Sequence, residues 1–403
     1  MTLLYQGSAA PQRGLWTTKP GLMGAILFGL LYLKLIISFD VELGMLGPLN
    51  YVLDILIMPL IALVLFCYHG RLSDSARLSV AALLGFTLYL VIQGGLYGQP
   101  GATTIYYTRF VLPLLLYYSL LLCSVNHRAR TNWLTENLVL LVFLLGLVGL
   151  WFMPETSNHD EAKLPTYFGN LHKSAYIFSV ALIVGSICLR NLSGSRRLAL
   201  AAMMVFAIYM LIDGWSIRTP LVLIAVYAGV LVMSRFGATG KSVLYLLVPV
   251  LVIALAALSA DSINWNRVSS GRLNMWQIKL QMLSGAELHQ FIFGRGFGSD
   301  HIRVDNWMGE KDSHNNFLQT ITELGLVGLI FLVANITLLY RTQPNLYGRA
   351  LVLGYTATGL FSNGIIYRLL PGYMFAIALA YITLAASEQR RKIPMRNGGF
   401  QGV

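Results

Sequence analysis

Apolar runs long enough to cross a bilayer restrict the fold of this 403-residue chain more than any other feature. Several runs reach about 18 residues or more, the length of a membrane-spanning helix. They are continuous rather than alternating, which argues against a membrane β-barrel. Charged residues make up 11% of the chain, against about 25% in a typical soluble domain. The sequence therefore predicts an all-α polytopic membrane protein, and it excludes a soluble globular protein, a disordered chain and a disulfide scaffold.

The apolar runs, read between charged breaks, predict about twelve spans in one integral membrane domain over residues 1–403. The expected spans are 21–38, 49–68, 78–97, 108–125, 134–153, 174–190, 198–213, 219–234, 242–260, 316–340, 349–366 and 371–387. Most connections between them are short. The exception is 261–315, between the ninth and tenth spans, and a loop of that length is usually either functional or disordered.

Lysine and arginine are unevenly distributed, which predicts the orientation in the membrane. With the N-terminus inside, the cytoplasmic segments hold 17 basic and 2 acidic residues, and the outer segments hold 11 basic and 12 acidic residues. Both termini are therefore expected in the cytoplasm. The formal net charge of +12 is a signal of topology and does not indicate nucleic acid as a partner. No cysteine falls in an outer loop, so we expect no disulfide or cysteine–metal site there.

A short amphipathic helix is expected near 271–284, at the middle of the long outer loop. Its apolar residues recur at helical spacing and comprise Leu273, Trp276, Leu280 and Leu283. Such a helix most simply lies at the membrane interface, with Ser269 or Ser270 as a possible N-cap. Arg272 falls in its first turn, and the pattern leaves two roles open for it. Its side chain faces a polar cleft, or it extends to lipid headgroups.

Two polar motifs follow in the same loop. Glycines alternate in 293–300, where successive N–H groups could bind an anion or form a plain turn. Further along, the polar segment Asp312-Ser313-His314-Asn315-Asn316-Phe317-Leu318-Gln319 stands at the entry to the tenth span, and Glu323 lies about two turns deeper. A histidine at an interface is ordinarily a simple hydrogen-bonding residue. The density of polar groups here favours a site facing a water-filled cavity.

Arginines also stand at the outer ends of several spans. They are Arg109, Arg218, Arg272 and Arg368, in a region of near-zero net charge. A guanidinium group stays charged and pairs bidentately with phosphate, so this set would suit a diphosphate lipid. His172 and Lys173 open the sixth span nearby. No histidine–carboxylate pattern typical of a metal site occurs on the outer side, and Glu310 and Asp312 are typical of a solvated loop.

Three segments resemble the O-antigen ligase and O-antigen polymerase superfamily. They are Ser270-Gly271-Arg272-Leu273-x-x-Trp276, Gly294-x-Gly296-x-Gly298 and Ser313-His314-Asn315-x-x-Leu318-Gln319-x-x-x-Glu323-x-Gly325-x-x-Gly328. The Ser216-x-Arg218 turn resembles the other arginine motif of that family, and 168–173 is a looser match. The resemblance covers 168–330.

The resemblance implies a glycosyltransferase of the C-type architecture, acting at the periplasmic face of the bacterial inner membrane. Its donor would be a saccharide on undecaprenyl diphosphate. Arg218 and Arg272 would stabilise the diphosphate leaving group, and His314 would act as the base or position the attacking hydroxyl. The reaction would be inverting and would need no metal or other cofactor. We expect the remaining outer polar residues to contact substrate, namely Arg109, His172, Arg295, Asn315, Glu323 and Arg368.

The acceptor separates the possible activities. A polymerase extends another lipid-linked repeat unit of a surface polysaccharide, whereas a ligase transfers the glycan to lipid A-core in lipopolysaccharide biosynthesis. The form Glu-x-Gly-x-x-Gly from Glu323 favours a polymerase, for which a chain-length regulator is a candidate partner besides membrane lipid. A polysaccharide transporter is the remaining alternative, in which Lys34, Asp54 and Glu323 form an ion relay.

Overall fold

Helices make up most of the chain in the computed structural model. It describes residues 19–39, 47–124, 127–152, 156–158, 161–163, 167–168, 171–215, 217–237, 271–303, 310–362 and 368–392. The predicted span 242–260 and the serines at 216, 269 and 270 lie outside these ranges.

A helix covers most of each of the other predicted spans, and the end of the span 349–366 lies outside the described residues from 363 on. The helices are α1 (Lys19–Phe39), α2 (Gly47–Tyr68), α3 (Asp74–Leu96), α4 (Pro100–Tyr106), α5 (Leu112–Ser124), α6 (Arg128–Phe152), α7 (Leu171–Cys188), α8 (Gly194–Tyr209), α9 (Arg218–Met233), α14 (Asn316–Thr342), α15 (Leu346–Phe361) and α16 (Leu369–Lys392). Two π-helical turns extend this set, η3 (Tyr107–Val111) between α4 and α5 and η4 (Met210–Gly214) after α8, and a 3-10 turn, η2 (His69–Arg71), follows α2.

Eight of the described helical stretches are long and apolar enough to cross a membrane. They are 20–39, 48–71, 74–96, 103–124, 128–151, 171–188, 194–214 and 316–342, with two shorter apolar helices at 218–233 and 369–385. This agrees with an all-α membrane protein. The count of twelve spans stays a prediction.

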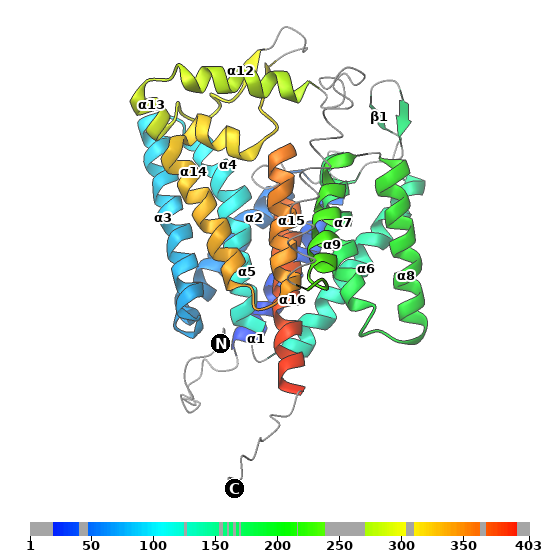
Figure 1. Cartoon of the computed structure of the whole chain (residues 1–403). Coiled ribbons are helices and arrows are strands. Elements are labelled where there is room, and N and C mark those ends of the chain that lie inside the picture. Colours follow the sequence, from blue (N-terminus) through cyan, green and yellow to red (C-terminus); the bar gives the residue numbers. More distant parts are fainter. Residues whose placement is uncertain are drawn as a thin grey trace.

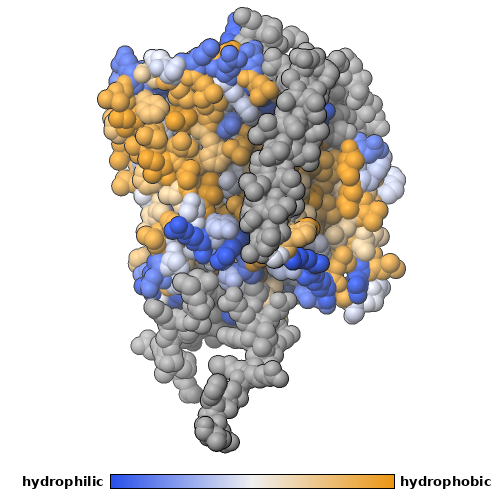
Figure 2. Space-filling view, viewed as in Figure 1, coloured by the Kyte–Doolittle hydropathy of each residue, from blue (hydrophilic) through white to orange (hydrophobic). Residues whose placement is uncertain are grey.

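The centre and the periphery of the bundle differ in burial. The stretches 103–124 and 171–188 are mostly buried inside the protein, whereas 194–214 is mostly exposed. Phe66 is 81% exposed and Leu198 is 73% exposed. Hydrophobic residues form a broad band on the visible face, with hydrophilic residues gathered at both ends (Figure 2). So much exposed apolar surface is typical of helices that face lipid.

Two further helices lie across one end of the bundle. They are α12 (Arg272–Ser284) and α13 (Leu288–Phe293), and Figure 1 shows them over the helix ends. The first helix begins and α16 ends at the opposite end (Figure 1). We call the end that carries α12 and α13 the α12 end. The helix predicted at 271–284 is therefore present, and its Leu273 and Leu280 are exposed.

Two short antiparallel hairpins complete the structure at this end. One pairs β1 (Thr156–Asn158) with β2 (Glu161–Lys163), and the other pairs β3 (Ile302–Arg303) with β4 (Glu310–Lys311). The second hairpin brings the segment after the glycine run back towards the start of α14.

Buried aromatic rings fix the α12 end of α7 and α9. Trp215 is fully buried, with its ring centroid 4.9 Å from that of Phe178 and 5.8 Å from that of Tyr167. The buried Thr219 and Pro220 follow in the first turn of α9. These contacts hold the turn that carries Arg218 on a rigid base.

Candidate functional site

A break in α14 anchors the glycine run. Gly325 has φ +68° and ψ −171° inside the helix, a conformation open essentially only to glycine. The main chain of Gly294 lies against it, since a Cβ on Gly325 would be 2.4 Å from the Gly294 nitrogen. Two carbonyls of the turn before the break, those of Thr322 and Glu323, accept hydrogen bonds from the loop. Arg295 N donates to Thr322 O over 3.0 Å, and Gly296 N donates to Glu323 O over 3.1 Å.

Glu323 supports this turn from within the bundle. Its side chain is almost fully buried, and its Oε1 accepts hydrogen bonds from Gly298 N at 3.1 Å and from Gln319 Nε2 at 3.3 Å. Tyr106 donates a hydrogen bond to its Oε2. Three N–H groups of the glycine run are thus bound by α14, which favours the plain turn over an anion site. In this structure Glu323 holds the turn rather than lining an open cavity.

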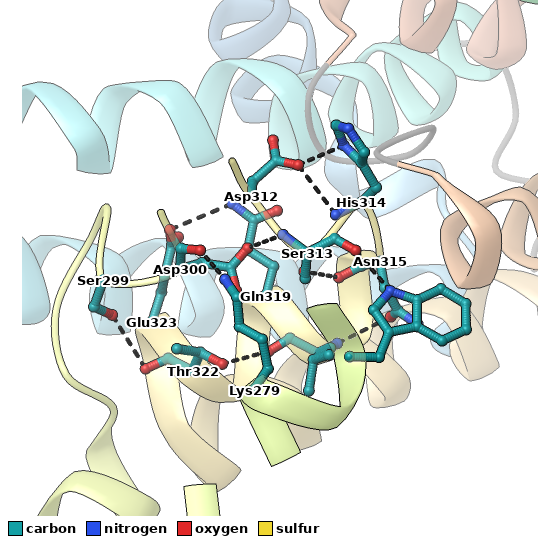
Figure 3. A network of polar contacts seen from close by, with 12 residues as sticks. Lys279, Ser299, Asp300, Asp312, Ser313, His314, Asn315, Gln319, Thr322 and Glu323 are labelled. Atoms are coloured by element: carbon teal, nitrogen blue, oxygen red, sulfur yellow. Dashed lines mark hydrogen bonds and ion pairs between the residues drawn. The ribbon is translucent and has the colours of Figure 1, made fainter. Parts of the chain in front are cut away.

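A buried ion pair joins α12 to the end of the glycine run. Lys279 Nζ lies 2.5 Å from Asp300 Oδ1, and both side chains are fully buried. Asp300 Oδ2 accepts a hydrogen bond from Ser313 N at 2.7 Å. Burial raises the pKa of the Asp300 carboxyl, and the Lys279 charge opposes that shift. Figure 3 shows this pair beneath the segment that carries His314. No sequence pattern predicts this pair.

His314 is held by the carboxylate two residues before it. Its Nδ1 lies 2.5 Å from Asp312 Oδ1, and its backbone N donates to the same oxygen over 3.0 Å (Figure 3). The backbone of His314 has φ +47°, which is uncommon for a residue other than glycine. Trp276 Nε1 of α12 donates to Ser313 O over 2.7 Å. The histidine ring is thus fixed at the α12 end, partly open to solvent.

Asn315 serves as the N-cap of α14. Its Oδ1 accepts hydrogen bonds from the backbone N–H groups of Phe317 and Leu318, each at 3.0 Å. Its Nδ2 donates to Leu360 O in α15, also at 3.0 Å. Both ends of the amide therefore hold backbone at the start of α14 and near the end of α15, and the contact of Asn315 with substrate stays a prediction.

Arg272 points inwards from the first turn of α12. Its Nη1 donates to Phe361 O, the last carbonyl of α15, over 2.6 Å. Burial lowers the pKa of its guanidinium, and Tyr176 and Asp312 act in the opposite direction. These neighbours favour the polar cleft over the lipid headgroups as its environment.

Arg368 lies beside the same groups at the start of α16. Its guanidinium stands over the Tyr176 ring, 5.4 Å from the ring centroid. Burial lowers the pKa of the Arg368 guanidinium. The nearby Tyr176, Tyr355 and Asp312 favour its charged form, and the nearby Arg109 disfavours that form. Arg368 and Arg272 therefore share electrostatic contact with the carboxylate that holds His314. Arg109, in η3, belongs to the same charged region.

The remaining predicted residues lie in different surroundings. Arg218 is exposed at the same end of the bundle, in the first turn of α9. His172 is half-buried in the first turn of α7. Arg295 turns away towards α12, where its Nη2 donates to Met282 O over 2.8 Å. The structure thus groups Arg109, Arg272, Arg368 and His314 and gives Arg295 a role within the loop.

Asp312, whose spacing from Glu310 is typical of a solvated loop, has a specific partner in the structure, His314. Within the part of the chain that the structure describes, no group of three or more His, Cys, Asp or Glu side chains could hold a metal ion.

No family model matches the chain, and the curated proteins contain no match to it.

Proposed function

We propose that this chain is a membrane glycosyltransferase of the O-antigen polymerase type. In this proposal it acts at the periplasmic face of the inner membrane on glycans carried by undecaprenyl diphosphate. The observation that carries the proposal is the His314–Asp312 pair, 2.5 Å apart, with Arg272 and Arg368 close enough to Asp312 to interact with its charge. A base and cationic groups at one end of a membrane bundle are the two elements that this transfer requires.

The chemistry follows from those two elements. The acceptor hydroxyl oxygen attacks the anomeric carbon, and the bond from that carbon to the diphosphate oxygen breaks. The hydroxyl proton moves to His314, and the electron pair of the broken bond leaves with the diphosphate. Arginine charges near the diphosphate stabilise the negative charge that it gains. A single displacement of this kind inverts the anomeric centre, and a product that retains the donor configuration would exclude it.

Asp312 fits the role of orienting the base. When Nδ1–H of His314 donates to the carboxylate, the lone pair of the ring is on Nε2. This is the tautomer that accepts a proton from a hydroxyl group. The carboxylate also stabilises the imidazolium that forms. The pair therefore supports catalysis more specifically than a lone histidine does.

The structure offers little to the transporter alternative. Lys34 Nζ pairs with Asp54 Oδ1 at 2.7 Å, and Tyr373 donates to the same carboxylate oxygen over 3.1 Å. Glu323 has its own partners at Tyr106, Gly298 and Gln319. The three residues proposed as a relay thus belong to two separate networks.

The glycan profile of a deletion strain tests the proposed activity. A missing polymerase leaves single repeat units on lipid A-core. A missing ligase leaves lipid-linked polymer and bare core. Core without any repeat units, with single lipid-linked repeat units accumulating on the cytoplasmic side of the membrane, would support a transporter. Activity that is lost in a metal chelator would contradict the metal-independent part of the proposal.

A further inference from the structure

The backbone of Ser313 is held on two sides by side chains that belong to α12 or pair with it. Trp276 Nε1 donates a hydrogen bond to Ser313 O over 2.7 Å. On the other side, Ser313 N donates to Asp300 Oδ2 over 2.7 Å, and Asp300 pairs with Lys279 of α12 (Figure 3). Trp276 and Lys279 are three residues apart, so they share one face of α12. The segment that carries His314 is therefore fastened to α12.

The hydrogen bond from Trp276 acts on the peptide unit that directs the His314 ring. The carbonyl of Ser313 and the N–H of His314 belong to one planar unit. Its oxygen accepts from Trp276, and its N–H donates to Asp312 Oδ1 over 3.0 Å. Rotation of this unit changes the φ angle of His314, which is +47°. Because both polar groups of the unit are bound, rotation breaks a hydrogen bond, and the uncommon backbone conformation is retained.

The same face of α12 carries Arg272. Arg272 and Trp276 are four residues apart, which makes them neighbours on the helix surface. Arg272 Nη1 donates to Phe361 O at the end of α15, while Trp276 holds the segment of His314. In the proposed transfer, Arg272 serves the leaving group and His314 serves the attacking hydroxyl. One helix thus connects the two groups and sets the distance between them.

We infer that Trp276 is a positioning residue for His314. Its indole N–H holds the Ser313–His314 peptide unit, which keeps the ring directed at Asp312 and at a constant distance from Arg272. The inference rests on the proposed function, in which His314 is the base, and it adds α12 as the element on which base and cation both depend. Trp276 acts through His314 and needs no contact with the reacting atoms.

A purely structural role for Trp276 makes a different prediction. If the side chain only packed α12 on the bundle, the size and shape of its ring would matter and its N–H group would not. Benzothienylalanine at position 276 separates the two roles, because it keeps the shape of the ring and has sulfur in place of the N–H group. Trp276→Phe is a second variant that also lacks the donor.

Steady-state kinetics of the purified protein with a lipid-linked oligosaccharide give the first readout. We expect kcat to fall about tenfold or more in both variants while KM changes less than about twofold, because the base is misplaced and the substrate contacts remain. Trp151→Phe, at a 75% exposed position of α6, is the matched control and should leave both constants unchanged. Unchanged kcat in the benzothienyl variant, with His314→Ala inactive, would overturn the inference.

Nuclear magnetic resonance gives a second readout that does not depend on activity. The Nδ1 proton of His314, held by Asp312, should give a downfield resonance protected from exchange with water, and its absence from His314→Ala assigns it. The benzothienyl variant should lose this protection while it unfolds at the wild-type temperature. A resonance that stays protected would overturn the positioning role. If the protection is lost but His314→Ala transfers glycan like the wild type, the positioning role stands and the proposed function fails.

Discussion

At the scale of single residues, His314 combines an uncommon backbone conformation with a ring that is held by a carboxylate, and this combination indicates a functional role. Its backbone is in the left-handed region, which costs about 1–3 kcal/mol for a residue other than glycine. Its ring and its N–H both bind Asp312 Oδ1. The reversed backbone allows this, because it brings a carboxylate two residues away against the ring. The strain thus serves to orient the imidazole.

The first prediction concerns that carboxylate. In Asp312→Asn the amide can donate to Nδ1, which places the ring proton on Nε2 and removes the basic nitrogen from the reaction. We expect glycosyl transfer to fall at least about tenfold, with the protein still folded. Glu287→Gln is the matched control, since Glu287 pairs with His289 at the same spacing but both are exposed. Equal activity of the two variants would remove Asp312 from the mechanism.

The second prediction concerns the buried ion pair. Lys279→Met leaves Asp300 buried without its cation, which should lower the free energy of unfolding by about 3–5 kcal/mol. Adding Asp300→Asn should recover a large part of that loss, because the amide oxygen can still accept from Ser313 N. Unfolding in detergent micelles measures both, with the exposed Arg303→Met as control. A single variant as stable as the wild type would contradict the account of this pair.

The sequence placed Asp312, His314 and Arg272 in outer segments, but it predicted neither the pairing of Asp312 with His314 nor that of Lys279 with Asp300. A helix puts side chains two residues apart on different faces, and a strand puts them on one face but about 6.6 Å apart along the chain. The contact of Asp312 with His314 needs the backbone reversal, which no local pattern signals. Lys279 meets Asp300 across a tertiary turn. Such contacts follow from the path of the loop, so residue types alone could not predict them.

At the scale of elements, the break in α14 organises the site. It frees the carbonyls of Thr322 and Glu323, and the glycine run binds both. Side chains of α3 hold the same run from the other side. Tyr97 donates to Gly294 O over 2.6 Å, and Gln93 donates to Phe293 O over 2.8 Å. Two elements, α14 and the C-terminal end of α3, thus hold the glycine run from opposite sides.

The third prediction follows from that break. Gly325→Ala introduces a Cβ that would lie 2.4 Å from the Gly294 nitrogen and the Ile292 oxygen, in a backbone conformation that disfavours alanine. We expect a loss of about 2 kcal/mol or more in stability. Proteolysis of the loop should also be faster. Gly229→Ala in α9 is the control, because nothing lies within 4 Å of its Cβ position. Similar stability of the two variants would contradict the anchoring role of the break.

The elements themselves were largely predictable from the sequence. Apolar runs bounded by polar residues define the helices. A helix in lipid satisfies the hydrogen bonds of its backbone internally, and a charged side chain buried in it costs free energy. The break at Gly325 was not predicted. Its neighbours Leu324 and Leu326 continue the apolar run, and only the docking of Gly294 against the main chain distinguishes Gly325 from any other helical glycine.

At the scale of the whole molecule, the candidate site, α12 and α13 share one end. The unequal distribution of lysine and arginine predicts that this end lies at the outer face of the membrane. The same prediction puts the start of α1 and the end of α16 on the inner side. The proposed periplasmic transfer requires this orientation, since its site has to lie on the side opposite the basic loops.

The fourth prediction tests this topology. In a cysteine-free background, Ser284→Cys at the end of α12 should react with a membrane-impermeant maleimide in cells with a permeabilised outer membrane. Ser193→Cys, between α7 and α8, should react only after lysis. Both positions are exposed, so accessibility within the protein does not distinguish them. Labelling in the reverse order would contradict the assigned orientation.

The most direct test of the central claim is the rate of glycosyl transfer by the purified protein with a lipid-linked oligosaccharide. His314→Ala should reduce this rate at least about a hundredfold, because it removes the proposed base. His289→Ala, an exposed histidine of the same loop, should leave the rate unchanged. Wild-type turnover by folded His314→Ala protein would contradict the claim that the His314–Asp312 pair carries out the transfer.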